Sequence, residues 1–170
     1  KDISIQRGNV LKYLRMLITR DENTGVVTLS MRQFVDDLIS HVGSTVVSPA
    51  NLDLLNENDI NATKLSESDR KWFHTMVAKL LYLSLRIRPD LLLSVSYLTT
   101  KVTKPTIYDQ MKLLRILKYL KLTRDKDMIF KPVSDSQMVL NGYIDASFAI
   151  HKDGKSHSGI VIKYGGITIF

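Results

Sequence analysis

The sequence predicts an α+β fold in which a β-hairpin, a bundle of helices and a second set of antiparallel strands follow one another along the chain. Two observations predict this order. Short apolar runs separated by turn residues lie near both ends of the 170-residue chain, whereas apolar residues recur at helical spacing through its middle. Apolar residues make up 44% of the chain and charged residues 24%, a balance typical of a globular rather than a disordered protein.

The N-terminal third predicts a hairpin, a helix and a linker. Two strands, 10–19 and 26–29, flank a turn at 21–25 that is rich in residues accepting positive φ. Apolar residues at a period of 3.6, closed by Gly43, predict a helix over 31–41. Residues 47–61 predict a linker, because a proline forces extension there and the asparagines that follow favour turns.

Three further helices are predicted between residues 66 and 125. Ser66 and Asp69 resemble a capping box at the start of the first helix, which has to end before Pro89. Pro89 suits the first turn of the second helix, with Asp90 near its positive end, and Pro105 opens the third in the same way. The expected core residues, in helix order, are Phe73, Met76, Val77, Leu80 and Leu81; Leu91, Val95, Leu98 and Val102; and Leu113, Ile116, Leu117 and Leu120.

The third of these helices sets a cationic face opposite its apolar one. At about 100° per residue, Lys112, Arg115, Lys118 and Lys121 spread over the half of the helix that faces away from its core residues. The whole chain has 24 Lys and Arg against 17 Asp and Glu, a formal charge of +7, which favours a polyanionic partner. The cationic half is expected either to contact phosphate groups, in a salt-dependent way, or to be an ordinary solvated face.

A carboxylate interrupts the C-terminal strands. Residues 140–162 predict a strand, a polar turn at Asp153-Gly154 and a second strand, with Asp145 in the middle of the first. Strands seldom contain Asp, because its side chain packs poorly on a pleated sheet and competes for backbone hydrogen bonds. Between apolar neighbours, Asp145 is expected to be partly desolvated and therefore hydrogen-bonded, paired or bound to a divalent cation.

Together these segments resemble the Pol polyprotein of copia-like LTR retrotransposons. The resemblance runs over residues 9–170, with its motifs in the family's order. It implies that residues 1–31 end a reverse transcriptase palm, that residues 32–125 form the helical thumb and connection, and that residues 126–170 begin an RNase H-like sheet. The matching motifs are Tyr13-Leu14-Arg15-Met16, Ser48-Pro49, Trp72-Phe73-His74, Ala78-Lys79-Leu80-Leu81-Tyr82-Leu83, Arg88-Pro89-Asp90, Ser94-Val95-Ser96, Pro105, Arg115-Ile116-Leu117-Lys118-Tyr119-Leu120, Gly142-Tyr143, Asp145-Ala146-Ser147, Lys155-Ser156 and Ser158-Gly159.

This resemblance implies a parent enzyme that synthesises DNA on an RNA template and hydrolyses the RNA of the hybrid. The present segment would position the template-primer and connect to the rest of the Pol polyprotein. Tyr13, Leu14, Arg15 and Met16 would form the primer grip, with Arg15 standing where the family has a glycine. Asp145 would be the first of four acids that hold two Mg²⁺ ions, the other three being expected beyond this chain.

One motif imitates a polymerase signature without fitting it. Phe34-Val35-Asp36-Asp37 resembles the Tyr-x-Asp-Asp hairpin of reverse transcriptases, yet its helical period directs both aspartates to solvent. The family's own Asp pair is expected upstream of this segment. As it stands, the segment is therefore expected to catalyse nothing.

Composition and spacing exclude other classes. The absence of cysteine excludes disulfides and thiolate zinc sites, and no apolar run approaches the roughly 20 residues of a membrane helix. His151 and His157 flank Asp153 but lack further ligands spaced to close a metal site. Two alternatives remain: a non-catalytic basic helical module that binds nucleic acid, or an inert retroelement relic, suggested by Arg15 and by ends that read as those of a fragment.

Overall fold

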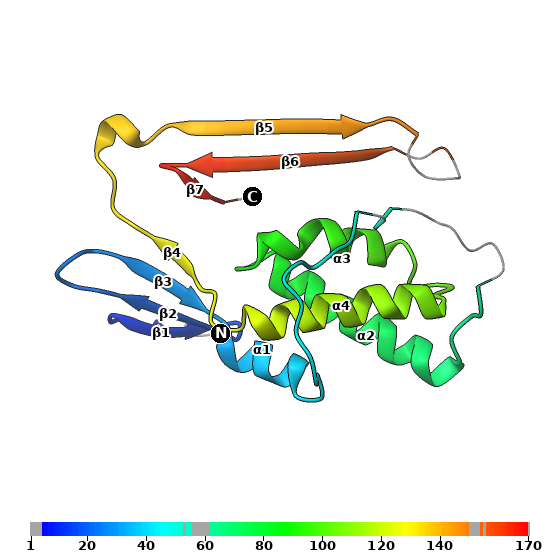
Figure 1. The fold of residues 1–170 in the computed structure, drawn as a ribbon. Coiled ribbons are helices and arrows are strands. Elements are labelled where there is room, and N and C mark those ends of the chain that lie inside the picture. Colours follow the sequence, from blue (N-terminus) through cyan, green and yellow to red (C-terminus); the bar gives the residue numbers. More distant parts are fainter. Residues whose placement is uncertain (1–4, 53, 56–61, 150–153, 155, 170) are drawn as a thin grey trace.

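The chain folds into a four-stranded sheet beside a helical bundle, followed by a smaller three-stranded sheet (Figure 1). The structure, a computed structural model, describes residues 5–52, 54–55, 62–149, 154 and 156–169. Within these ranges the mixed α+β class is confirmed, with four α-helices and two antiparallel sheets. None of the described helices is both long and apolar enough to cross a membrane.

The first sheet has the strand order β1-β2-β3-β4, and every neighbouring pair is antiparallel. The sequence predicted one strand over 10–19, but a two-residue turn at Leu14-Arg15 splits it into β1 and β2. The φ angles of Leu14 and Arg15 are +47° and +67°, the conformation of tight hairpin turns that usually contain Asn or Gly. The strands are β1 (Val10–Tyr13), β2 (Met16–Arg20), β3 (Val27–Ser30) and β4 (Met128–Phe130).

The last strand of this sheet comes from far along the chain. β4 lies within the predicted segment 126–170, yet it pairs with β3, bringing Val27 opposite Phe130. β4 therefore belongs to the first sheet and not to the sheet of the C-terminal strands.

The predicted helices are present, with local signals at their starts. Ser66 caps α2 by accepting a hydrogen bond from the Asp69 amide at 3.2 Å. Thr106 and Asp109 form a reciprocal capping box on α4, so Pro105 precedes the cap instead of opening the helix. The helices are α1 (Arg32–Ile39), α2 (Glu67–Ser84), the 3₁₀ turn η1 (Pro89–Leu91), α3 (Leu92–Thr99) and α4 (Ile107–Leu122).

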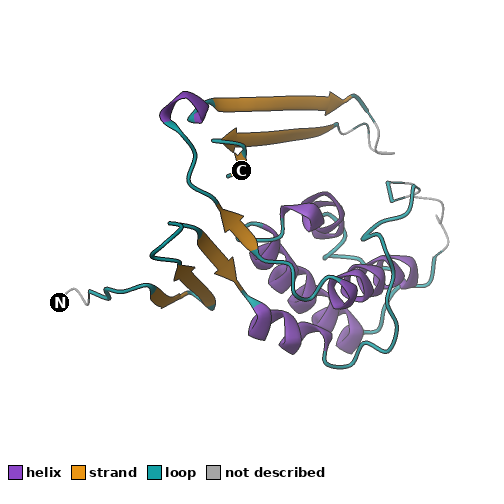
Figure 2. Cartoon of the chain, turned by 60° about the vertical axis from the view of Figure 1, so that its left-hand side comes forward, coloured by secondary structure: helices purple, strands orange, loops and turns teal. Residues whose placement is uncertain are grey.

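The core lies between these helices, which pack against one another as a bundle (Figure 2). α4 contacts α1, α2 and α3 through the apolar face that the sequence predicts. The predicted core residues are buried, except that Leu81 and Val102 are only half-buried. The fully buried residues of the face on α4 are Leu113, Ile116, Leu117 and Leu120.

The second sheet is joined to the first by β4 and a short 3₁₀ turn, η2 (Asp135–Gln137). Its strands are β5 (Leu140–Ser147), β6 (His157–Tyr164) and β7 (Ile167–Thr168). Gly165 and Gly166, both at positive φ, form the β6–β7 turn, which the sequence analysis did not predict. Of the predicted Asp153-Gly154 turn only Gly154, at φ +75°, lies within the described residues.

Candidate nucleic-acid interface

The predicted primer-grip residues form the β1–β2 turn and its flanks. Tyr13 is 61% exposed, and Leu14 and Arg15 are also exposed, so three of the four can meet a ligand. Met16 instead packs into the core with only 9% of its surface exposed, because it begins β2 on the side that faces the helices. The surface available for nucleic acid is therefore Tyr13 to Arg15.

Aromatic side chains of two helices hold this turn in place. The Tyr82 hydroxyl of α2 donates a hydrogen bond to the Leu14 carbonyl at 2.5 Å. The Phe34 ring of α1 packs edge-on against Tyr82, with 5.7 Å between ring centroids. The Arg15 guanidinium lies 5.8 Å from the centroid of the Phe34 ring and donates a hydrogen bond to Asp37 at 3.0 Å. These contacts tie the turn to α1 and α2.

An open cleft of 430 Å³ lies between this turn and the start of α1. Three cations line it, Lys12, Arg15 and Arg32, together with one acid, Asp36. Arg32 forms an exposed ion pair with Asp125 at 3.1 Å, and exposed pairs of this kind are weak. A phosphate entering the cleft could therefore compete for Arg32 as well as for the other cations.

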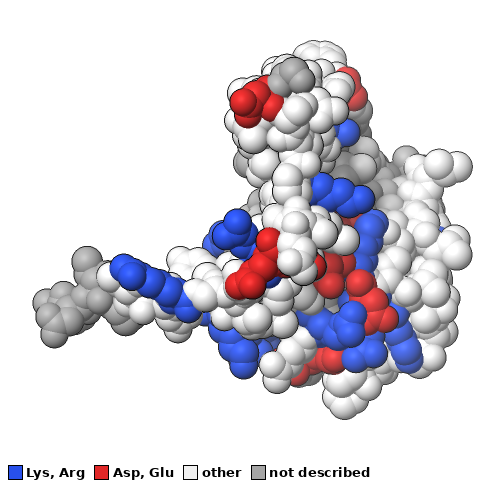
Figure 3. Space-filling view, turned by 90° about the vertical axis from the view of Figure 1, so that its left-hand side faces the viewer, with Lys and Arg blue, Asp and Glu red and all other residues white. Residues whose placement is uncertain are grey.

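The acids of this face are already paired with cations. The Arg124 guanidinium donates two hydrogen bonds to Asp36 and, with the additional positive charge of Arg32, holds the pKa of Asp36 below its ordinary value. Asp36 and Asp37 lie on α1, as predicted, and each binds an arginine rather than standing free in solvent. Figure 3 shows the result: Lys and Arg gather below the second sheet, with Asp and Glu among them.

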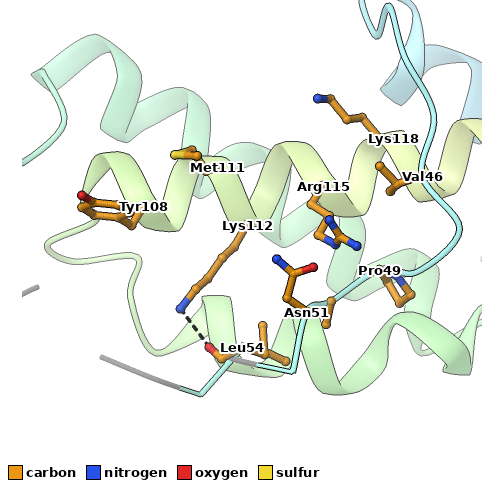
Figure 4. A pocket seen from close by; sticks show the side chains of 10 residues that line it. Val46, Pro49, Asn51, Leu54, Tyr108, Met111, Lys112, Arg115 and Lys118 are labelled. Carbon is orange, nitrogen blue, oxygen red and sulfur yellow. Dashed lines mark hydrogen bonds between the residues drawn. The ribbon is translucent and has the colours of Figure 1, made fainter. Parts of the chain in front are cut away.

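The cationic side of α4 is not an open surface. The Lys112 ammonium donates hydrogen bonds to the Leu54 carbonyl at 2.8 Å and to the Tyr97 hydroxyl at 3.1 Å. The Lys121 ammonium donates to the Val42 carbonyl. All four predicted cations are half-buried, because the described residues of the segment 42–55 lie along this side of the helix (Figure 4). Lys112 and Lys121 therefore anchor that segment, whereas the buried Nε atom of Arg115 has no hydrogen-bond partner among the described residues.

Asp145 lies on β5 as predicted, but its surroundings differ from the prediction. Every residue of β5 is exposed, so the expected desolvation of the carboxylate by Ile144 and Phe148 is wrong. The Asp145 carboxylate accepts a hydrogen bond from the next backbone amide, Ala146, at 2.9 Å. Cross-strand pairing places Gly159 opposite it. This geometry satisfies the carboxylate locally.

The described residues do not fit a metal centre on their own. In these parts of the chain no three His, Asp or Glu side chains come together in a way that could hold an ion. Of the group weighed in the sequence as a metal site, His151 and Asp153 lie outside the described residues, whereas His157 begins β6. Asp145 is thus a single carboxylate, too few ligands for two Mg²⁺ ions, which bind through several oxygens each.

Sequence reasoning missed the residues that build the interface around the turn. No sequence pattern marked Lys12 or Arg32 as binding residues. Tyr82 and Phe34 were predicted only to lie on helices. The available signal for Tyr82 was its half-buried aromatic ring on α2, whose hydroxyl needs a hydrogen-bond partner. No protein-family model and no solved structure matches this chain.

Proposed function

We propose that this chain is a nucleic-acid-binding segment of a copia-like retroelement polymerase, and that it holds an RNA–DNA hybrid against the β1–β2 turn and the start of α1. The observation that carries the proposal is the cleft of 430 Å³ lined by Lys12, Arg15 and Arg32 beside the exposed Tyr13. Lys and Arg bind phosphate oxygens, and an aromatic ring offers a surface to a sugar or base.

Binding of this kind reads the shape of a duplex rather than its sequence. The lining of the cleft supplies cations on a rigid hairpin, and contacts to phosphate position a duplex without distinguishing bases. The ordered motifs that resemble the copia-like family support the same class of ligand. In a complete parent enzyme Asp145 would contribute one carboxylate to a Mg²⁺ site, and no hydrolytic step is assigned to the residues described here.

A salt titration tests the proposal. The full chain should bind a fluorescently labelled RNA–DNA hybrid, with an affinity that falls linearly as salt rises on logarithmic axes. Replacing Lys12 or Arg32 with Gln should lower that slope by about 0.9 each. The control is Lys79→Gln on α2, an exposed lysine outside the cleft, which should leave the slope unchanged. Absence of binding at low salt, or equal slopes for all variants, would refute the proposal.

A second candidate is a binding module without any catalytic role. It is favoured by the exposure of Asp145 and by its bond to the neighbouring amide. This candidate predicts that Asp145→Asn and removal of Mg²⁺ leave hybrid affinity unchanged. A loss of affinity in either experiment would instead favour a carboxylate that works with a metal.

A further inference from the structure

A second cleft, between α4 and the described residues of 46–54, contains a buried hydrogen-bond donor without a partner. The Nε atom of Arg115 is buried and has no hydrogen-bond partner, the one side-chain atom of which this holds among the described residues. Arg115 projects from α4 toward Asn51 and Pro49 (Figure 4). A buried donor left unsatisfied costs free energy, more so when it belongs to a charged group. Arg115 therefore calls for an acceptor.

The cleft has both the room and the charge for an anion. Its volume is 290 Å³, and its lining includes Lys112, Arg115 and Lys118. Of the described residues that line it, none is acidic. The Lys112 ammonium is held at one end by the Leu54 carbonyl, whereas the Nε atom of Arg115 has no partner. Cations with no acidic residue among the described lining give a concave surface a positive potential.

We propose that this cleft binds a phosphate group through the guanidinium of Arg115. A phosphate has several acceptor oxygens, and the planar fork of an arginine matches them with two parallel hydrogen bonds. One ligand would thus satisfy the buried Nε and neutralise the cations around it. The cleft shares no lining residue with the one beside the β1–β2 turn.

The neighbours of Arg115 favour the backbone of a single-stranded nucleic acid over a free phosphate ion. Tyr108 and Met111 line the same cleft and are 44% and 62% exposed. They lie N-terminal to Arg115 on α4, and Tyr108 is seven residues away, about 10 Å along the helix axis. A base can stack on such a side chain while its strand carries a phosphate to the arginine. This assignment deepens the proposed nucleic-acid function and rests on it only for the identity of the ligand.

Inorganic phosphate is the first probe, with ionic strength held constant by chloride. Phosphate should raise the melting temperature of the full chain in a saturable manner, and Arg115→Gln should abolish the rise. Arg115→Lys keeps the charge but loses the fork, and should weaken phosphate binding at least about tenfold. Lys79→Gln, an equal change of charge outside the cleft, should respond as the unaltered chain does.

The melting temperatures of the unaltered chain and the Arg115→Gln variant in phosphate-free buffer distinguish a binding role of Arg115 from a structural one. Arg115→Gln removes a buried N–H donor that has no partner, so without phosphate this variant should melt at the same or a higher temperature. A lower melting temperature for Arg115→Gln in phosphate-free buffer would show that Arg115 has a partner within the protein, and would overturn the proposal. A phosphate response that Arg115→Gln retains would overturn it equally.

A thymidine octanucleotide is the second probe, and it identifies the source of the phosphate. The octanucleotide should bind more tightly than inorganic phosphate, and Tyr108→Leu should weaken octanucleotide binding several-fold while leaving phosphate binding intact. Equal affinities for the two probes would refute the nucleic-acid part of the assignment. If neither probe binds but the RNA–DNA hybrid does, the cleft fails and the proposed function stands. If both probes bind but the hybrid does not, the proposed function fails and the cleft stands.

Discussion

The buried guanidinium of Arg88 donates two hydrogen bonds to the Asp90 carboxylate, from Nε and Nη2, each 2.9 Å long. Only 1% of the Arg88 side chain is exposed. The same guanidinium donates to the carbonyl and hydroxyl of Thr123, and the Tyr119 hydroxyl donates to Asp90 at 2.9 Å. This network ties the start of η1 to the C-terminal end of α4. It therefore joins the segment that follows α2 to the central helix of the bundle.

Breaking this pair should destabilise the whole helical unit. Asp90→Asn leaves the Arg88 charge buried without its counter-charge, and removing one partner of a buried pair costs about 3 kcal/mol. Urea unfolding should show a free energy of unfolding that is lower by about 3 kcal/mol for Asp90→Asn. Lys126→Gln is the matched control, because this lysine touches the same carboxylate at 3.4 Å but is 55% exposed, and its loss should be worth under about 0.5 kcal/mol. Equal effects for the two variants would contradict the account.

The Asp90 carboxylate should also make the free energy of unfolding depend on pH at the acidic end of the range. Burial alone would raise the pKa of Asp90, but the hydrogen bonds and charge of Arg88, the Tyr119 hydroxyl and the charge of Lys126 outweigh it and lower that pKa below its ordinary 3.8. The folded state then releases this proton more readily than the unfolded state, so its contribution is full above pH 3.8 and is lost as pH falls through the folded pKa.

The link between the protonation of Asp90 and stability can be measured by comparing the unaltered chain with the Asp90→Asn variant. The gap in unfolding free energy between the unaltered chain and Asp90→Asn should narrow as pH falls below about 4, because both then carry an uncharged group at position 90. Unfolding in urea at several pH values measures it. A gap that stays constant down to the acid transition would show that Asp90 is not the group that titrates.

Arg15 occupies a backbone conformation that favours glycine. At φ +67° a residue with a Cβ is strained, and a glycine is not. Arg15→Gly and Arg15→Ala lose the same contacts to Asp37 and Phe34, so comparing them isolates the backbone. The glycine variant should be more stable than the alanine variant by about 1 kcal/mol in thermal or urea unfolding. A more stable alanine variant would mean that the turn does not adopt this conformation.

The helices could be predicted because their signals are local. Ser66 caps α2 and Pro89 begins η1, where the sequence placed a helix start. The core face of α4 follows from the spacing of Leu113 and Leu117 alone. Each of these features depends on residues within a turn or two of each other, so no knowledge of the tertiary fold was needed.

The features that could not be predicted depend on distant contacts or on unusual turn residues. Leu14-Arg15 contains neither Asn nor Gly, so nothing marks it as a tight turn. The pairing of β4 with β3 joins residues about 100 positions apart, and sequence spacing carries no trace of it. The described residues of the segment 42–55 cover the cationic side of α4, which an amphipathic pattern alone predicts to be open to solvent. The exposure of Asp145 could not be predicted either, because the apolar neighbours expected to shield its carboxylate are themselves exposed.

The lysines of α4 should control the order of the segment that they anchor. Lys112→Met removes a charged donor from the Leu54 carbonyl and should cost about 1.5 kcal/mol locally. Hydrogen exchange of backbone amides in the described part of 42–55 should accelerate, while exchange in α2 and α4 stays slow. Lys118→Met, on the same side of the helix, is the control that should leave this segment unaffected. Unchanged exchange in Lys112→Met would show that the hydrogen bond does not hold the segment.

The most direct test of nucleic-acid binding at the β1–β2 turn is amide hydrogen exchange of the full chain with and without an RNA–DNA hybrid at low salt. The account predicts slower exchange at residues 12–16 and at the start of α1, around Arg32, with the protection lost at high salt. Protection confined to β5 and β6, or no protection at any salt concentration, would contradict it.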